Sequence, residues 1–583
     1  MSPRVAAGAL SIVCCALPSL AWADCKVVNY GMMQVEVVGQ RATTMVGVNG
    51  KETRFMLDTG ATYGTLARAN VEALGLKREG APFGMRMSGV GGSTSVDLTR
   101  VKDLGLLGVT LHDMTFLVGG SDTGMGVIGA NLIDVFDADI DLANGQFKLF
   151  RPSGCGSLAM AYWAKDGQFQ TAELHHAEKE SDRRSFVDVM INGRPVRALL
   201  DTGAQATEIS RRAAERVGLD MSKADAGGGL VTRGVGGQSR KSWILPVDTY
   251  AIGTETIQHN KMLVIDGDFG EGSDAPDMLL GIDFFLAHHV YIANSQHKIY
   301  FTYNGGRMFT FGKAPAGTAA PAKDDGAKLS AADYALRGQG HLSRGEIAQA
   351  NADLDAAIAE APDVAAYRLT RARTRLAARK PDEAMDDLGA AIRLDDQNID
   401  ALLLRARIRY ARKDKAAAEQ DIEAARKLAP AGSARTRVLA SFYVAMERPA
   451  EALPLLDDWI RLHAEDADLP DVLNARCWAR GLANEQLDGA LSDCNRAIRA
   501  NKDQGVFYST LGLVQLRQGH NGEAQASYEK ALSMLSRSAW AHYGLGLAYL
   551  RQGQAQKGEA EIAAAKAINP GIAELAGRYG LTS

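Results

Sequence analysis

The stretch Phe55-Met56-Leu57-Asp58-Thr59-Gly60-Ala61 decides the fold of the first half of this chain, because it occurs twice. It returns as Ala198-Leu199-Leu200-Asp201-Thr202-Gly203-Ala204, at an offset of 143 residues. Each copy is an apolar run, typical of a buried strand, that leads directly into Asp-Thr-Gly-Ala. The same side chains therefore stand at the same turn in two places.

The repeat continues on both sides of this stretch, in the same order. The matching pairs are Val48–Gly50 with Ile191–Gly193, Gly89–Gly92 with Gly234–Gly237, Val127–Gly129 with Leu279–Gly281, and Phe147–Phe150 with Lys298–Phe301. The offset grows slowly to 152, as insertions in loops between paired strands would produce. We therefore predict two copies of one all-β domain of short strands and glycine-rich turns, over residues 35–150 and 180–302.

The repeated residues suit acid–base chemistry. Gly60 and Gly203 permit backbone angles that other residues avoid and let another strand approach closely. The hydroxyls of Thr59 and Thr202 can bond to nearby backbone and stiffen the loop. Two aspartates a few ångströms apart share one proton, because they do not both ionise. The charged carboxyl can then activate a water as general base while the protonated one polarises a carbonyl, as the two carboxyls of aspartic proteases do.

With these motifs in this order, both copies resemble the retropepsin-type aspartic peptidase domain. The resemblance implies that Asp58 and Asp201 form a catalytic pair that needs neither metal nor cofactor, with the two threonines bonded across a pseudo-twofold axis. It also implies that two glycine clusters form flaps over the substrate. These flap residues are Gly89, Gly91 and Gly92 in the first copy and Gly234, Gly236 and Gly237 in the second. Thr62 and Gln205 depart from the acidic residue that viral members carry after the alanine, which places that substrate-backbone contact in doubt.

Two other motifs are interpreted as structural. Asp122-Thr123-Gly124 is a third Asp-Thr-Gly, but no apolar strand precedes it and the second copy has no equivalent. We interpret it as a turn. The His175-His176 pair lies in the segment between the copies, residues 151–182, which we expect to be a connector. No further ligand stands at metal-binding spacing, so no metal site is expected there.

Length, charge and the N-terminus limit the remaining possibilities. A chain of 583 residues exceeds one hydrophobic core, and a net charge of −4 argues against nucleic-acid binding. Arg4, the apolar run Val5–Leu17 and the small residues of Ala21–Ala23 form a signal peptide pattern over residues 1–23, cleaved after Ala23. Later apolar runs fall short of the roughly 20 residues of a spanning helix. We expect a periplasmic or secreted protein.

Four cysteines remain after the predicted cleavage. An even number in an oxidising compartment favours disulfides, and four cysteines allow three pairings. We favour Cys25 with Cys155, which bracket the first copy, and Cys477 with Cys494 as a local pair. The other pairings remain open on sequence alone.

The second half has helical periodicity. A linker over residues 303–328, rich in Ala, Pro and Gly from Lys313, precedes it. The ends of apolar helical segments then step by 34 residues from Pro362 to Pro430 and again from Lys502 to Pro570, the period of tetratricopeptide repeats (TPRs). The sequence resembles a TPR solenoid of about seven helical hairpins over 329–583, with a C-terminal cap. A few extra residues interrupt the period around Glu465–Pro470.

These features together predict an exported aspartic endopeptidase of two lobes, acting on a protein or peptide substrate. The concave groove of the TPR solenoid is expected to bind substrate or a protein partner, with an inert spacer as the alternative. A homodimer that pairs each lobe with its own copy is a less favoured arrangement, since fusion gives a higher effective concentration. A non-catalytic peptide-binding adaptor is the alternative function.

Overall fold

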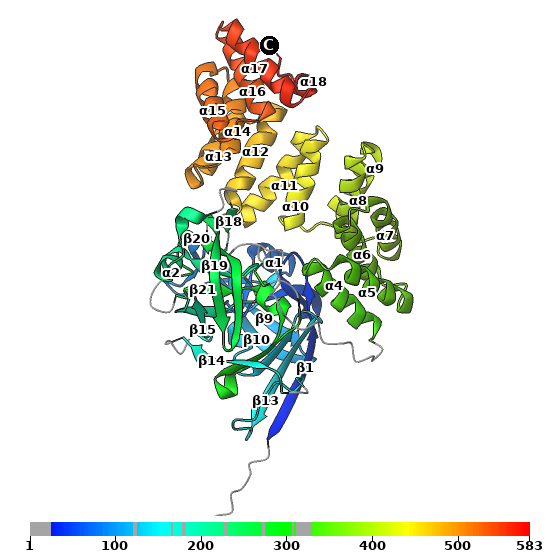
Figure 1. Cartoon of the computed structure of the whole chain (residues 1–583). Coiled ribbons are helices and arrows are strands. Elements are labelled where there is room, and N and C mark those ends of the chain that lie inside the picture. The colour runs from blue at the N-terminus through cyan, green and yellow to red at the C-terminus, as the bar shows by residue number, and fades with distance from the viewer. Residues whose placement is uncertain are drawn as a thin grey trace, which may run out of the picture.

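The chain folds into two β-rich lobes followed by a curved helical array (Figure 1), which confirms the predicted fold class. The computed structural model describes residues 25–120, 125–164, 167–177, 182–224, 230–232, 234–236, 238–270, 275–305, 308–309 and 329–582. The predicted signal peptide, the Asp122–Gly124 turn, Gly237 and residues 310–328 of the linker lie outside this range. Among the described helices, none combines the length and apolar character needed to cross a bilayer.

Lobe 1 is one sheet of eight strands that closes on itself. Its order is β2 (Glu36–Val37), β3 (Ala42–Val48), β4 (Lys51–Leu57), β11 (Gly126–Ile128), β5 (Thr65–Leu66), β10 (Val109–Val118), β9 (Asp97–Leu106) and β6 (Arg78–Gly80). The additional pairing of β3 with β9 brings the two sides together. The short helix α1 (Arg68–Ala73) and the 3₁₀ turn η1 (Ala130–Leu132) complete the lobe, and β7 (Arg86–Gly89) and β8 (Gly92–Ser95) form a separate two-stranded ribbon.

Lobe 2 repeats this topology. Its order is β15 (Ser185–Ile191), β16 (Arg194–Leu200), β21 (Met278–Leu280), β17 (Glu208–Ser210), β20 (Glu255–Ile265), β19 (Arg240–Ile252) and β18 (Leu230–Thr232). Here β15 pairs with β19 to close the lobe. The short helices are α2 (Arg211–Arg216) and α3 (Ile282–Ala287), with the 3₁₀ turns η2 (Met221–Lys223) and η3 (Asn294–Gln296).

Six strands form the sheet that joins the lobes, and β14 at one end also pairs with β15, so that the sheet continues into lobe 2. Its order is β1 (Lys26–Gln34), β13 (Gln146–Ser153), β12 (Asp137–Asp141), β22 (His288–Ala293), β23 (Lys298–Tyr303) and β14 (Gln170–His176). The central pair β12 and β22 runs antiparallel across the pseudo-twofold axis, with Asp139 opposite Tyr291.

The predicted domain bounds of 35–150 and 180–302 leave out β1 and β14. The segment expected to be only a connector therefore contributes a strand, in which His175 is exposed and His176 is half-buried. β1 lies at the free edge of the joining sheet and β14 lies between β23 and β15. Most side chains of both strands are exposed or half-buried. Their apolar alternation is too weak to mark a strand in the sequence.

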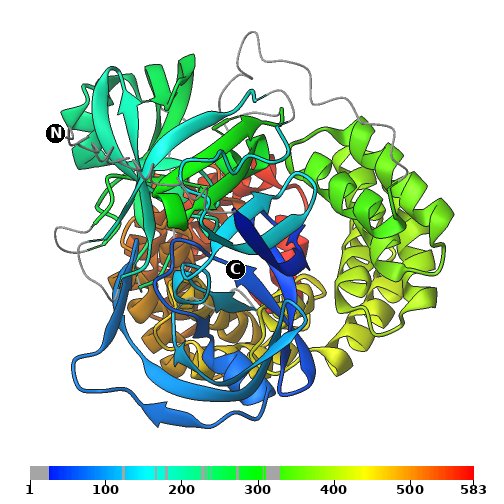
Figure 2. The ribbon, with the colours of Figure 1, turned by 90° about the horizontal axis from the view of Figure 1, so that it is seen from below.

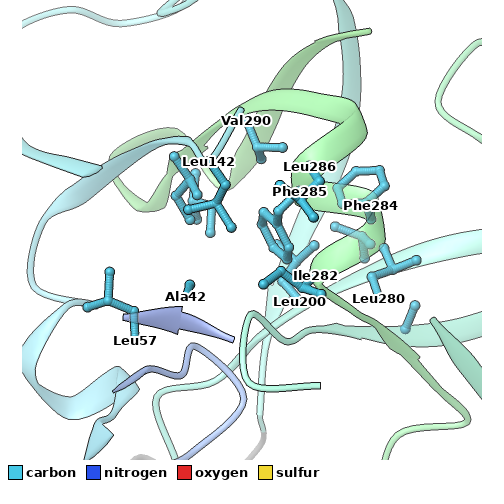
Figure 3. Packing of buried hydrophobic residues seen from close by; sticks show 14 of the residues in the cluster. Ala42, Leu57, Leu142, Leu200, Leu280, Ile282, Phe284, Phe285, Leu286 and Val290 are labelled. Carbon is cyan, nitrogen blue, oxygen red and sulfur yellow. The ribbon is translucent and has the colours of Figure 1, made fainter. Parts of the chain in front are cut away.

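One hydrophobic core runs through both lobes. It includes Leu57 and Leu142 from lobe 1 and Leu200, Phe285 and Val290 from lobe 2. Figure 3 shows Leu142 facing Phe285 and Val290 across the boundary between the lobes. Because the strands that end at the two aspartates belong to this shared core, the core fixes one lobe against the other.

Both disulfides join the pairs favoured from the sequence. Cys25 is linked to Cys155, which ties the start of β1 to the end of β13. Cys477 is linked to Cys494 and joins the two helices of one hairpin in the array.

Residues 331–568 form seven helical hairpins. The helices are α4 (Ala331–Ser343), α5 (Ile347–Glu360), α6 (Ala365–Ala377), α7 (Pro381–Leu394), α8 (Ile399–Ala411), α9 (Lys415–Leu428), α10 (Ala434–Ala445), α11 (Pro449–Leu462), α12 (Leu469–Ala483), α13 (Leu487–Ala500), α14 (Gly505–Arg517), α15 (Asn521–Met534), α16 (Ala539–Arg551) and α17 (Ala555–Ile568). The short helix α18 (Ile572–Arg578) caps the array.

A partly buried ion pair recurs inside these hairpins. An arginine on the first helix donates two hydrogen bonds to an aspartate on the second. The pairs are Arg337 with Asp353, Arg371 with Asp387, Arg405 with Asp421, and Arg476 with Asp493. Bidentate pairs of this kind fix the geometry between helices as well as their separation.

The array curves around lobe 1 and contacts it directly (Figure 2). Gln339 of α4 donates from Nε2 to the carbonyl oxygen of Val37 over 3.0 Å. A methyl group on Gly340 would stand 2.4 Å from the carbonyl oxygen of Ala143, so α4 lies against the lobe backbone itself. The first repeats thus use part of their surface to hold the lobe.

Candidate active site

The two Asp-Thr-Gly-Ala loops lie at equivalent places in the two lobes. β4 and β16 each end one residue before the aspartate. β11 runs parallel to β4 and β21 runs parallel to β16. The amide of Asp58 donates to the carbonyl oxygen of Ile128 over 3.0 Å, and the amide of Asp201 donates to that of Leu280 over 2.9 Å. Each aspartate is therefore fixed by a strand passing behind its loop.

A glycine follows this supporting strand in each lobe because two backbones cross there. A Cβ atom on Gly129 would stand 2.5 Å from the carbonyl carbon of Tyr63, and one on Gly281 would stand 2.3 Å from that of Ala206. Carbon atoms do not approach so closely without displacement. The apolar-Gly pair recognised in the sequence is thus a steric requirement of the crossing.

The two threonines lock the loops to each other. The amide of Thr59 donates to Oγ1 of Thr202, and the amide of Thr202 donates to Oγ1 of Thr59, both over 3.1 Å. Each hydroxyl then donates to the backbone of the opposite lobe, Thr59 to Leu200 O over 2.7 Å and Thr202 to Leu57 O over 2.8 Å. All four bonds are buried, so they hold the lobes in register at the site.

This lock brings the two aspartates into contact within one chain. The carboxyl groups of Asp58 and Asp201 lie close enough for the charge of Asp201 to raise the pKa of Asp58, after the larger effect of burial. A methyl group on Gly60 would stand 2.3 Å from Cγ of Asp201, and one on Gly203 would stand 2.3 Å from Cγ of Asp58. Each glycine therefore leaves the space that the carboxyl of the other lobe fills.

Each carboxyl also accepts hydrogen bonds from its own loop. Oδ1 of Asp58 accepts from the amides of Gly60 and Ala61 over 3.0 and 2.8 Å. Oδ1 of Asp201 accepts from the amides of Gly203 and Ala204 over 2.9 and 3.0 Å. These bonds fix one oxygen of each group and favour its charged form.

Burial and mutual repulsion work against full ionisation of the pair. Burial, and then the charge of Asp201, raise the pKa of Asp58 well above its ordinary value. Burial also raises the pKa of Asp201, while the loop amides oppose this. Both groups lie deep in the molecule yet keep some accessible surface. These effects disfavour the state in which both carboxyls are charged, and water can reach the pair.

The predicted flaps meet tip to tip. The first is the β7–β8 ribbon, and the amide of its Gly91 donates to the carbonyl oxygen of Val235 over 2.8 Å. The amide of Gln238 donates to Gly91 O over 3.1 Å. A Cβ atom on Gly236 would stand 2.3 Å from the carbonyl carbon of Gly91. Backbone therefore packs on backbone, which only glycine allows.

The flap glycines lie at or next to this contact. Gly89 and Gly92 face each other at the turn of the ribbon, and Gly234 lies against Val90. Val90 also packs against the apolar cluster that Ala204 of the second catalytic loop adjoins. The first flap therefore packs on the same apolar cluster as the Asp201 loop of the opposite lobe.

Three charged residues near the site, Asp182, Arg184 and Glu208, were not identified from the sequence. Thr62, which stands where viral relatives have an acid, donates a long hydrogen bond of 3.5 Å to Asp182. Asp182 pairs with Arg184 through bonds of 2.9 and 2.6 Å. Burial raises the pKa of Asp201, and the positive charge of Arg184 opposes that rise. A carboxylate from the segment between the lobes thus lies beside the position where the family acid is missing.

Glu208 is the third of these residues. It begins β17, seven residues after Asp201, and only 6% of its surface is exposed. It accepts one long hydrogen bond, 3.4 Å, from Oγ1 of Thr232. Burial, with the charge of Asp201 second, raises the pKa of Glu208 to about 8. Seven residues after Asp58, the first lobe has Thr65, so the repeat did not single out this acid.

Comparison with known protein families matches both halves of the chain. Residues 44–132 and 187–284 match the aspartyl protease family. Residues 336–399, 369–433 and 509–571 match the tetratricopeptide repeat family. These matches confirm the two resemblances drawn from the sequence. No curated protein matches the chain.

Solved structures that are similar to this chain include TPR proteins. A tetratricopeptide repeat protein from Parabacteroides merdae is 16% identical, with 43% of this chain and 98% of that chain covered and a TM-score of 0.34. YrrB, a TPR protein, is 17% identical, with 37% and 92% covered and a TM-score of 0.24. A chain of the APC/C hetero-tetramer Cut9–Hcn1 is 14% identical, with 38% and 43% covered and a TM-score of 0.30, so this chain spans less than half of it.

Proposed function

Because the chain carries two aspartyl protease domains followed by tetratricopeptide repeats, we propose that it is an exported endopeptidase that hydrolyses peptide bonds with Asp58 and Asp201. The observation that carries this proposal is the contact between the two carboxyls, one from each lobe. An inert protein with this fold would have no need to keep both aspartates, both threonines and both glycines packed together at the boundary between the lobes.

The chemistry follows from the shared proton. Asp201, in its charged form, takes a proton from a water placed between the carboxyls, and that water attacks the peptide carbonyl carbon. Asp58 keeps its proton because of burial and the neighbouring charge, and it donates a hydrogen bond to the carbonyl oxygen as negative charge develops there. Asp201 then passes the proton that it took from the water to the peptide nitrogen, the C–N bond breaks, and the carbonyl re-forms in the new carboxyl group. Asp58 is again protonated and Asp201 charged. No covalent intermediate is required.

Export is part of the proposal. The signal peptide pattern in residues 1–23 supports it, and the disulfides Cys25–Cys155 and Cys477–Cys494 suit an oxidising compartment. The periplasm or the exterior would both meet this requirement.

The TPR array supplies binding surface for substrate or a partner. Its first repeats already hold lobe 1 through α4, so we assign the binding role to the remaining inner surface. The array then keeps a bound polypeptide close to the peptidase lobes.

Substrate profiling of the mature protein tests this function. Unfolded proteins and peptide libraries are incubated with the wild type and with Asp201→Asn, and new termini are identified by mass spectrometry. The proposal predicts cleavage by the wild type alone, blocked by a peptide mimic with a hydroxyl at the scissile carbon. Saturable peptide binding with no cleavage at any pH would instead favour a non-catalytic adaptor.

A further inference from the structure

The irregularity in the TPR period lies at a contact with the first flap. The loop of residues 463–468 joins α11 to α12, and Glu465 lies within it. Oε2 of Glu465 accepts from the amide of Ser95 over 3.1 Å and from the hydroxyl of Thr94. Oε1 accepts from Oγ of Ser95 over 2.8 Å. One carboxylate thus receives three donors from β8, the second strand of the flap ribbon.

The loop itself is firmly held. His463 is buried, stacks on Trp459 with ring centroids 4.2 Å apart, and shares a 2.7 Å hydrogen bond with the carbonyl oxygen of Gly432. Asp466 is also buried and accepts from the amide of Asp468 over 2.8 Å. Glu465 is therefore presented by a rigid part of the array rather than by a free surface loop.

Other contacts tie the same face of the array to both lobes. Arg461 of α11 pairs with Glu72 of lobe 1 over 3.2 Å. Lys241 of lobe 2 pairs with Asp503, between α13 and α14, over 2.7 Å. Exposed pairs of this kind contribute little stability, but they show that the array contacts both lobes, which lie below it in Figure 1.

The contact of Glu465 bears on the tip of the flap. β8 begins at Gly92, directly after the Gly91 that bonds to Val235 of the second flap. The ribbon has only two strands and pairs with neither lobe sheet in the described part of the chain. A two-stranded ribbon is marginally stable alone, so an outside anchor on β8 sets its position.

We propose that Glu465 is a positioning residue for the peptidase, which holds the β7–β8 flap so that its tip meets the second flap over Asp58 and Asp201. This role rests on the proposed function. The extra residues between the helices of the array are then explained as the arm that reaches the flap. The array contributes to substrate binding through the flap as well as through its own groove.

Two measurements on Glu465→Ala test this role. Hydrogen exchange by mass spectrometry should show about tenfold faster exchange in residues 86–95, since three charge-assisted bonds are lost, with other regions unchanged. For a peptide found by the profiling, KM should rise about tenfold with little change in kcat, because substrate must now order the flap. Glu559→Ala, an exposed glutamate on α17, is the matched control.

The partners of Glu465 give a second route to the same answer. Thr94→Val with Ser95→Ala should reproduce the effect, and adding Glu465→Ala should change little more. Glu465→Gln keeps the shape of the side chain and serves if the alanine variant unfolds. Unchanged flap exchange in folded Glu465 variants would overturn the proposal. If the variant showed faster flap exchange but the wild type cleaved no peptide, the proposed peptidase activity would be rejected. The role of Glu465 in holding the flap would stand, because the exchange measurement needs no catalysis.

Discussion

Removing the hydroxyl of Thr59 should separate the two lobes at the site. Thr59→Val keeps nearly the same volume but loses the oxygen that accepts from Thr202 N and donates to Leu200 O. Both backbone groups are buried beside Thr59, which is 5% exposed. An unsatisfied buried backbone group costs about 1–3 kcal/mol, so two of them should cost about 2–6 kcal/mol.

The matched control is Thr59→Ser, which keeps the hydroxyl and loses only a methyl group. The two lobes share one core and should melt as one unit, whose midpoint shifts by roughly 2 °C per kcal/mol. The valine variant should therefore melt roughly 4–12 °C below the serine variant. Near-UV circular dichroism follows the transition, and peptide cleavage should fall in parallel. Midpoints within about 1 °C of each other would refute the role assigned to the crossed threonine bonds.

Three further perturbations address the site and its scaffold. Gly60→Ala would place a methyl group 2.3 Å from Cγ of Asp201 and should reduce kcat/KM by more than about 100-fold. The control is Gly80→Ala, whose methyl group meets open space and should leave kcat/KM unchanged. Equal activities of the two variants would contradict the close approach. Burial raises the pKa of Glu208 in the folded protein from 4.5 to about 8, so the unfolded state loses this proton first and stability falls as pH rises between these values. Glu208→Gln should remove that fall. Melting midpoints of wild type and variant that change in parallel from pH 5 to 8 would contradict this. Cys155→Ser opens a loop of 130 residues and should lower the free energy of unfolding by about 5 kcal/mol. Cys494→Ser opens a loop of 17 residues and should lower it by about 3 kcal/mol. The reverse order in denaturant titrations would contradict the loop argument.

The site was predictable because its parts repeat and each repeated residue has a steric or bonding reason. Gly60 makes room for a carboxyl, Gly129 for a crossing strand, and Gly91 for the opposite flap. Such requirements leave a local sequence motif in both lobes. The TPR period was predictable for a similar reason, since each hairpin packs on the next in the same way.

What the sequence did not reveal depends on contacts between distant segments. Glu465 and Thr94 are 371 residues apart, and neither lies in a repeated motif. Asp182 lies beside Thr62 only because the joining sheet brings the two lobes together. Glu208 looks like a surface residue until the fold buries it. Periodicity reports which face of an element is buried, but it does not report what covers that face.

The central claim is that Asp58 and Asp201 act as one catalytic pair within a single chain. It is tested most directly by kcat/KM of monomeric Asp58→Asn and Asp201→Asn, each shown to be folded and disulfide-bonded. The account predicts a loss of more than about 1,000-fold in both variants, since neither carboxyl can replace the other. Full activity in either single variant would contradict a shared pair.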